Sequence, residues 1–337
     1  MFSFYRRMIC KAFTFRRFYN LAISEAAYAL SLLCRKPIVW GYPVSVMIEP
    51  TNFCNLQCPL CPSGAGLLTR ERGYMDFGLY KKVIDSVCKD SCAILLWNQG
   101  EPFLHQDICQ MIEYAHSKRM IVILSTNANV FPDPVQLVQS GLDQLIISAD
   151  GASQETYNKY RVNGEIEKVI DNIKKIVASK VKASGKMSPY ILCQFIVMKH
   201  NEHEIEYAKK IFGELKIDQF VLKTVQILSK EDIENFLPSN PKYRRYKTKG
   251  NVFELKYGVK NQCFRLWHRP VINWDGEMAV CCFDKDNQYK IGNIQNRSFM
   301  DLWKSNQFIT FRKNVLRDRK IYEICRNCGE GISLRVK

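Results

Sequence analysis

A chain of 337 residues, with 47% hydrophobic and 24% charged residues, has the length of about two globular domains and a composition that excludes a disordered or fibrous protein. No apolar run reaches the ~20 residues of a membrane-spanning helix. The nearest run, residues 21–34, contains Glu25, and we expect an uncleaved helix there rather than a signal peptide. The formal charge of +16 predicts either a solvated basic surface or an acidic partner, which would be nucleic acid, anionic lipid or protein.

The chain contains fourteen cysteines, which suggests disulfides, metal sites or buried thiols. Disulfide scaffolds are usually short and rich in loops, whereas the apolar patterns of this chain are long and periodic. We therefore expect a reducing, cytoplasmic compartment and metal–thiolate bonding. Six cysteines lie outside the two clusters described below, and we expect them to be core residues: Cys10, Cys34, Cys88, Cys92, Cys109 and Cys193.

Residues 1–40 are predicted to form an amphipathic helical segment, because their polar residues recur near a helical period. Aromatic residues and arginines, among them Arg6 and Arg7, are interleaved in residues 1–19. A helix of this kind suits either peripheral contact with a membrane or packing against the rest of the protein. The sequence leaves both alternatives open.

From residue 44 onward, short apolar runs alternate with longer helix-like segments. Near-continuous apolar strands, each followed by an amphipathic helix, are typical of parallel strands that are buried on both faces. The predicted strands are residues 44–49, 92–98, 120–126, 143–149, 191–198 and 220–227. This pattern predicts an α/β fold over residues 41–227, either a partial (β/α)6 TIM-like barrel or a doubly wound sheet.

Two further segments follow the predicted strands. Residues 228–262 contain Pro238, Pro241 and many charges, and we interpret them as a linker. Residues 263–337 carry cysteines and turn residues of their own, which predicts a small metal-stapled domain.

Three closely spaced cysteines, Cys54, Cys58 and Cys61, follow the first predicted strand. In a fold of alternating strands and helices, functional groups lie on the loops after the carboxyl ends of strands. A zinc site normally needs four ligands, and no fourth cysteine or histidine lies nearby in this loop. Three thiolates can instead hold three irons of a 4Fe–4S cluster and leave the fourth iron free to bind another ligand.

The segment IEPTNFCNLQCPLC resembles the Cys-x3-Cys-x2-Cys loop of radical S-adenosylmethionine (SAM) enzymes, with Leu60 where that family usually has an aromatic residue. Later strand ends resemble the same family: NQGEP at 98–102, with Gln99 in place of a glycine, STN at 125–127 and ISADG at 147–151. The resemblance implies a partial (β/α)6 barrel, a 4Fe–4S cluster that binds SAM, and SAM contacts from Gly100, Glu101, Asn127, Ser148 and Arg161.

The resemblance also implies roles for four of these residues. Gly100 would let the backbone approach the ligand closely, and Glu101 would accept hydrogen bonds from the amino group of SAM. Ser148 and Arg161 would hold its carboxylate, the arginine through a charge-assisted contact.

A second set of cysteines, Cys263, Cys281, Cys325 and Cys328, lies near the C-terminus. Their spacing suits a structural zinc site as well as an iron–sulfur cluster, and a buried Cys281–Cys282 pair without metal is a third alternative. With the intervening segments WDGEMAVCC and IGNI, this region resembles the C-terminal twitch domain of SPASM-type radical SAM proteins. The resemblance implies one auxiliary 4Fe–4S cluster, because no cysteine follows Cys328 in this sequence.

The family resemblance implies an enzyme that cleaves SAM reductively and uses the 5′-deoxyadenosyl radical to abstract hydrogen from a substrate. Four cysteines would leave the auxiliary cluster without a free iron, so we expect it to accept an electron in a two-electron oxidation of a peptide or small molecule. The expected reductant is a flavodoxin or ferredoxin. The alternatives are an RNA-modifying enzyme and a non-catalytic iron–sulfur carrier or sensor. Nucleic-acid binding is not expected, because the sequence contains no recognisable RNA-binding module.

Overall fold

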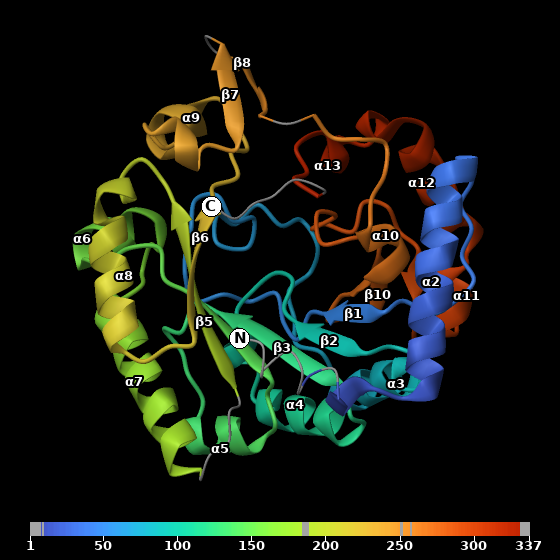
Figure 1. Ribbon diagram of the computed structural model, residues 1–337, viewed down its shortest axis with the longest axis horizontal. Coiled ribbons are helices and arrows are strands. Elements are labelled where there is room, and N and C mark those ends of the chain that lie inside the picture. The colour runs from blue at the N-terminus through green and yellow to red at the C-terminus, as the bar shows by residue number, and fades with distance from the viewer. Residues whose placement is uncertain (1–7, 9, 184–188, 250–251, 257, 331–337) are drawn as a thin grey trace.

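A nine-stranded sheet is the centre of the computed structural model, which describes residues 8, 10–183, 189–249, 252–256 and 258–330 (Figure 1). The strand order is β11-β10-β9-β1-β2-β3-β4-β5-β6. The strands are β1 (Ser45–Ile48), β2 (Ala93–Leu96), β3 (Ile121–Thr126), β4 (Gln144–Ser148), β5 (Tyr190–Val197), β6 (Gln219–Thr224), β9 (Val271–Ile272), β10 (Glu277–Ala279) and β11 (Gly292–Asn293). Neighbouring strands from β1 to β6 are all parallel, which confirms the predicted α/β fold.

Amphipathic helices cover the outer face of the parallel strands (Figure 1). They are α3 (Phe77–Val87), α4 (Ile108–Ser117), α5 (Pro134–Gln139), α6 (Gln154–Tyr160), α7 (Ile166–Lys182) and α8 (Ile205–Glu214). In α7, for example, Ile166, Val169, Ile173 and Ile176 are buried at helical spacing, and the helix presents its lysines elsewhere. The main apolar core therefore lies between the helices and the strands.

The other face of the strands forms a smaller apolar surface inside the barrel. Met47 and Leu95, on neighbouring strands, pack there with Val271, and Trp97 and Cys282 border this cluster. Successive side chains of a strand point to opposite faces, so the residues between them in sequence belong to the main core. This inner surface leads to the carboxyl ends of the strands, where the predicted site residues lie.

The N-terminal segment closes the amino ends of the strands. Met8 packs against Leu192 and Val221, and the ammonium group of Lys11 lies 2.5 Å from the carboxylate of Asp143, just before β4. Arg6 and Arg7, whose charge contributed to the predicted basic N-terminus, lie outside the described residues.

Helix α2 (Phe15–Cys34) has a polar buried face, the reverse of an ordinary amphipathic helix. The guanidinium group of Arg17 donates hydrogen bonds to the carbonyl oxygens of Cys88, Lys118 and Arg119, at and just beyond the C-terminal ends of α3 and α4. A cation at this position satisfies carbonyl groups that have no partner within their own helices. The polar face of α2 therefore binds it to the barrel.

The N-terminal end of α2 leaves aromatic side chains exposed. Phe13, Phe15, Phe18 and Tyr19 have exposed fractions of 57%, 82%, 56% and 59%. Within the described residues, no helix combines the length and the apolar character needed to cross a bilayer. The helix packs on the protein and also presents an apolar surface to its surroundings, and peripheral contact with a membrane remains a prediction.

Regular elements also occur in residues 228–262, which we interpreted as a linker. These are α9 (Glu231–Phe236), the 3-10 helix Pro241–Tyr243, β7 (Tyr246–Lys249) and β8 (Val252–Leu255). The last two form an antiparallel pair that stands apart from the main sheet (Figure 1). The division of the chain at residues 40, 227 and 262 remains a prediction.

The C-terminal region continues the barrel sheet through β9. This strand pairs in parallel with β1, where Met47 lies opposite Val271 and Ile48 opposite Ile272. The amide of Glu49 donates to the carbonyl of Ile272 at 2.9 Å. The other elements of this region are α10 (Arg265–His268), α11 (Phe299–Trp303), α12 (Asn306–Asp318), the 3-10 helix Arg319–Ile321 and α13 (Glu323–Arg326). One continuous sheet therefore joins the barrel to the C-terminal region that carries the second set of predicted cysteines.

The prediction that all six isolated cysteines are core residues is wrong for two of them. Cys109 and Cys193 are buried and Cys88 and Cys92 are half-buried, but Cys10 and Cys34 are exposed. The apolar residues around Cys34 suggested a core position. The buried face of α2 is largely polar, however, and apolar side chains at its C-terminal end such as Leu33 are exposed.

Candidate functional site

The loop after β1 carries the three predicted ligands of the first cluster. Cys58 is buried, Cys54 and Cys61 are half-buried, and all three are free thiols. The amide of Cys61 donates to the carbonyl of Cys58 at 3.1 Å, which turns the loop back on itself. Burial raises the pKa of Cys54 to about 12. A thiol in such a position stays protonated until a metal replaces the proton, which fits ligands of a cluster.

Gly100, which follows β2, has a φ of +75°, a conformation that favours glycine. A Cβ at this position would lie 2.5 Å from the carbonyl oxygens of Thr51 and Phe53. The glycine therefore lets the turn after β2 pack against the start of the cysteine loop. The amide of Glu101 donates to the carbonyl of Phe53 at 2.7 Å and fixes this contact.

Glu101 is a buried carboxylate that is held only by neutral donors. It accepts hydrogen bonds from the Thr126 hydroxyl at 2.7 Å, the Asn127 amide at 2.7 Å and the Phe103 amide at 3.1 Å. Burial raises the pKa of Glu101 to about 7. Among the described residues Glu101 has no ion-pair partner, and its fourth lone pair is free. This environment fits the amino group of SAM, which could donate to that oxygen.

Asn127, at the end of β3, connects the turn to the cysteine loop. Its side-chain amide donates to Asn55 Oδ1 at 2.9 Å and lies 3.9 Å from Cys54 Sγ. Ser148 is the last residue of β4 and is buried. The structure thus brings the ends of β1, β2 and β3 into direct contact, and the end of β4 follows next along the sheet.

Arg161 ends α6 and reaches the first cysteine site. Its Nη1 lies 3.7 Å from Cys58 Sγ, and its guanidinium group contacts Asp150 Oδ2 at 2.5–2.7 Å. Asp150 also accepts from the amide of Ile196 on β5, at 2.6 Å. Asp150 therefore fixes the arginine that we predicted to bind the SAM carboxylate. Sequence reasoning did not select Asp150, although it lies inside the quoted ISADG segment.

A second buried ion pair near the site was also missed. Glu49, at the end of β1, is fully buried and binds both terminal nitrogens of Arg70, at 2.6 and 2.7 Å. The same carboxylate accepts from the Gln99 amide and the Asn98 side chain, each at 3.1 Å. It thereby joins three loops around the site. Asn98 Oδ1 is buried without a hydrogen-bond partner in the described part of the chain, which leaves an acceptor for a bound group.

The structure places the four predicted ligands of the auxiliary cluster in the interior of the C-terminal region. Cys263, Cys281, Cys325 and Cys328 are all buried free thiols. Burial raises the pKa of Cys263 to about 12 and that of Cys325 to about 11. Burial also raises the pKa of Cys281, and the thiols of Cys282, Cys263 and Cys328 raise it further. Among the described residues, no three His, Cys, Asp or Glu side chains are arranged to bind one metal ion. The thiolates of a 4Fe–4S cluster bind different irons, so they need not meet at one point.

Two arginines lie beside this second set of cysteines. Arg319 is almost fully buried, has no carboxylate partner among the described residues, and leaves its Nε without a hydrogen bond there. A buried cation of this kind requires compensating negative charge, which an anionic cluster bound by four thiolates would supply. Arg265 contacts Cys282 Sγ at 2.5 Å and Glu330 at 2.6 Å. The half-buried Cys282 therefore has a partner of its own.

Comparison with known proteins identifies the family. The radical SAM superfamily model matches residues 48–215, and the SPASM model, an iron–sulfur cluster-binding domain, matches residues 263–329. The chain belongs to the radical SAM superfamily. The two matched ranges contain all seven predicted cluster cysteines. The protein is therefore an enzyme of the oxidoreductase type. A non-catalytic iron–sulfur carrier or sensor is no longer an alternative.

Two relatives and one solved structure illustrate the similarity. A tungsten-containing aldehyde ferredoxin oxidoreductase cofactor-modifying protein of Pyrococcus furiosus is 24% identical, over 84% of this chain and 86% of the relative. Mycofactocin maturase MftC of Mycobacterium tuberculosis is 26% identical, over 87% and 77%. The structure of Streptococcus suis SuiB bound to SAM has 15% identity and a TM-score of 0.61, over 88% of this chain and 74% of SuiB. At that identity the likeness supports the fold.

Membership of the family defines the cofactors. The radical SAM domain binds a 4Fe–4S cluster and SAM, and the SPASM domain binds auxiliary iron–sulfur clusters. Iron–sulfur chemistry therefore replaces the zinc site and the metal-free cysteine pair as the interpretation of the C-terminal region. The number of auxiliary clusters remains a prediction.

Proposed function

We propose that this radical SAM enzyme catalyses a two-electron oxidation of a peptide, with one auxiliary 4Fe–4S cluster as the acceptor of the second electron. The single observation that carries the proposal is the presence of two cysteine sets: three thiols in the loop after β1 and four buried thiols in the C-terminal region, which is joined to β1 through β9. The relatives support a peptide substrate, since one is named a mycofactocin maturase and SuiB has been solved with its precursor peptide SuiA. Oxidation of a small molecule is the second candidate.

In this proposal, Cys54, Cys58 and Cys61 hold three irons of the first cluster. When bound, this cluster supplies the electron that converts SAM to methionine and a 5′-deoxyadenosyl radical. Glu101 accepts hydrogen bonds from the SAM amino group through its free lone pair. Because Asp150 already fixes the guanidinium group, Arg161 is oriented toward the SAM carboxylate before binding.

The remaining proposed contacts follow from position along the sheet. Ser148 donates to the SAM carboxylate from the end of β4, and Asn127 holds the cysteine loop in place. Gly100 permits the tight turn that carries Glu101. The apolar inner face of the barrel, formed by Met47 and Leu95, keeps water away from the reacting groups.

The proposed second set of ligands is Cys263, Cys281, Cys325 and Cys328. Because four thiolates would leave no iron vacant, these residues would hold a cluster that supplies electron transfer and does not bind the substrate. The reaction then balances: SAM and substrate give methionine, 5′-deoxyadenosine, a product with two hydrogens fewer, and one proton. The electron used to cleave SAM is recovered from the substrate radical.

The charge and the exposed aromatic side chains of the protein support two further proposed partners. The net charge of +16 favours an acidic reductant of the flavodoxin or ferredoxin type. The aromatic side chains exposed on α2, together with Arg16, form a surface that suits the boundary of an anionic membrane. Both partners belong to the proposal.

The test is anaerobic reconstitution with iron and sulfide, followed by dithionite, SAM and candidate precursor peptides. We expect 5′-deoxyadenosine and oxidised peptide in a one-to-one ratio. Cys58→Ala should abolish both products, whereas Cys34→Ala, which changes an exposed thiol on α2, should retain them. A methylated or epimerised peptide would contradict the two-electron oxidation. Specific retention of RNA in a gel-shift assay at physiological salt would favour the RNA-modifying alternative.

A further inference from the structure

Two adjoining hollows lie at the surface between the C-terminal end of α2 and the second half of α12. Their volumes are about 510 and 410 Å³, and they share Arg35 and Asn261. We call them together the basic hollow, because the charged residues that line them are Arg35, Lys260, Lys313, Arg317, Lys320 and a single carboxylate, Asp318.

No described residue forms an ion pair that would neutralise the charge of the basic hollow. All five cationic side chains belong to exposed residues, and none of them forms an ion pair with another described residue. The carboxylate of Asp318 accepts a hydrogen bond from the backbone amide of Lys320. The surface therefore presents a concave positive charge, which attracts a partner with a negative surface.

The wall of the basic hollow is also the wall of the auxiliary site. Residues 260–262 lead directly into Cys263. The guanidinium group of Arg319 donates to the carbonyl oxygens of Lys260, at 3.4 Å, and Gln262, at 3.3 Å. On the inner side, the charge of Arg319 acts on the thiols of Cys325 and Cys328. One buried side chain and one short backbone segment thus separate the hollow from the cysteines.

We propose that the basic hollow is the docking site of an acidic one-electron carrier protein, of the flavodoxin or ferredoxin type, that exchanges electrons with the auxiliary cluster. This inference rests on the proposed function, in which that cluster holds the electron taken from the substrate radical. The carrier in its oxidised form accepts this electron and becomes reduced by one electron. The reduced carrier can then supply the electron for the next cleavage of SAM, so turnover consumes no net reductant.

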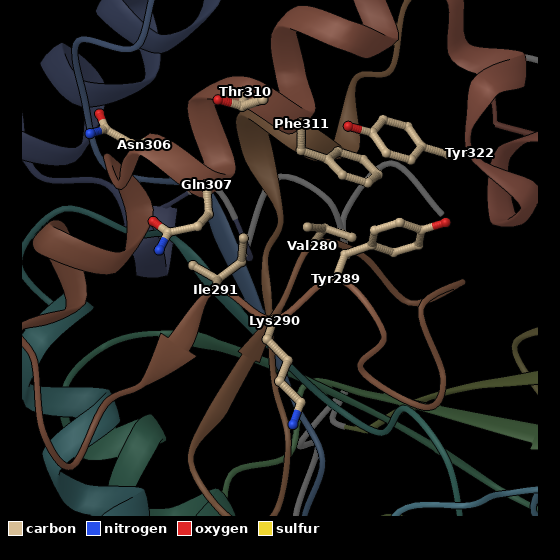
Figure 2. A pocket seen from close by; sticks show the side chains of 9 residues that line it. All are labelled: Val280, Tyr289, Lys290, Ile291, Asn306, Gln307, Thr310, Phe311 and Tyr322. Atoms are coloured by element: carbon tan, nitrogen blue, oxygen red, sulfur yellow. The ribbon is translucent and has the colours of Figure 1, made fainter.

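A second cavity in the same region serves as a comparison. It measures about 500 Å³ and is lined by Tyr289, Phe311 and Tyr322, whose rings gather on one side, while Lys290 extends away from them (Figure 2). It is close to the auxiliary site in sequence, since Tyr322 precedes Cys325 by three residues. Its volume is similar to that of each part of the basic hollow, but Lys290 is the only charged residue among the described residues that line it. Charge therefore distinguishes the two surfaces.

The experiment measures electron exchange between the full-length enzyme, with both clusters reconstituted, and an acidic flavodoxin. Dithionite-reduced enzyme, freed of excess reductant, is mixed with oxidised flavodoxin. Formation of the flavodoxin semiquinone is followed by absorbance, and freeze-quench EPR follows the auxiliary cluster. The test variant is Lys313→Glu with Arg317→Glu. The control is Lys290→Glu with Lys175→Glu, which changes the net charge equally but leaves the basic hollow intact.

We expect the test variant to lower the second-order rate constant roughly tenfold at low ionic strength, because steering by complementary charge is lost, and to approach the wild type at high salt. The control should stay within about twofold of the wild type. An equal loss in both variants, or no loss in the test variant, would overturn the proposal. Dithionite-driven formation of 5′-deoxyadenosine and oxidised peptide needs no carrier, so failure there would reject the proposed function and leave this measurement to judge the docking site.

Discussion

At the scale of single residues, Glu101 connects the fold to cofactor binding. Burial without a cationic partner raises the pKa of Glu101 to about 7. In the absence of SAM, an acid with a raised pKa makes the folded state bind more protons than the unfolded state between pH 4.5 and 7. Its contribution to stability therefore decreases as pH rises through that range. The affinity for SAM depends on pH in the opposite sense. Only the ionised carboxylate of Glu101 has a free lone pair, where the protonated form carries its proton, to accept a hydrogen bond from the amino group of SAM.

The affinity for SAM should therefore decrease as the pH falls through 7. Between pH 8 and pH 6 we expect a loss of roughly tenfold, measured by equilibrium dialysis with the reconstituted enzyme. The amino group of free SAM titrates as well, so Glu101→Gln is the necessary control. That variant should bind more weakly at pH 8 and have a flatter pH profile. An unchanged profile in Glu101→Gln would assign the titration to SAM alone.

Part of the site was predictable from sequence, and the reason lies in local spacing. Three cysteines within eight positions, and strand ends that follow one another in a known order, are visible without coordinates. The Glu49–Arg70 pair is different, because it joins the end of β1 to a loop 21 residues later, and Arg70 lies outside every motif quoted above. Such pairs are set by tertiary packing, so periodicity and spacing carry no signal for them.

At the scale of elements, α2 depends on Arg17 for its attachment. Replacing Arg17 with Met would leave the carbonyl groups of Cys88, Lys118 and Arg119 without their buried donor. We expect the free energy of unfolding to fall by about 2–3 kcal/mol. The adjacent Arg16 pairs with Asp90 at the surface, where solvent screens the charges, so Arg16→Met should lower the free energy of unfolding much less than Arg17→Met. Urea titration of both variants checks the difference, and equal losses would contradict this account of α2.

The exposed aromatic side chains of α2 give a separate prediction. If this surface contacts lipid, Phe15→Ser with Phe18→Ser should reduce co-sedimentation with anionic vesicles severalfold, because apolar area is lost from the membrane boundary. Tyr207→Ser, which changes a similarly exposed aromatic residue on α8, should leave co-sedimentation unchanged. Wild-type protein that stays in the supernatant would contradict the membrane contact and leave only the packing role of α2.

Prediction of the elements themselves was accurate where the apolar pattern was long. The six parallel strands begin and end within a few residues of the predicted runs, since each is a continuous apolar segment between helices. The strands β9 and β11 have two residues each, too few to show any periodicity. Their place in the barrel sheet therefore could not be read from the sequence, and the C-terminal region was expected to be a separate unit.

At the scale of the whole molecule, the pairing of β9 with β1 makes the two regions depend on each other. A chain that ends at residue 262 would leave β1 as an unpaired edge and expose the apolar residues that β9 and β10 cover. We expect this shortened chain to aggregate on expression, as judged by size-exclusion chromatography. A monodisperse product with native helical content would show instead that residues 1–262 fold independently.

The same pairing has a consequence for the position of the two cysteine sets. The loop of Cys54, Cys58 and Cys61 follows β1, and Cys281 follows β10, which is joined to β1 through β9. Backbone hydrogen bonds between adjacent strands allow little sliding, so the sheet limits how far these two loops can move relative to each other.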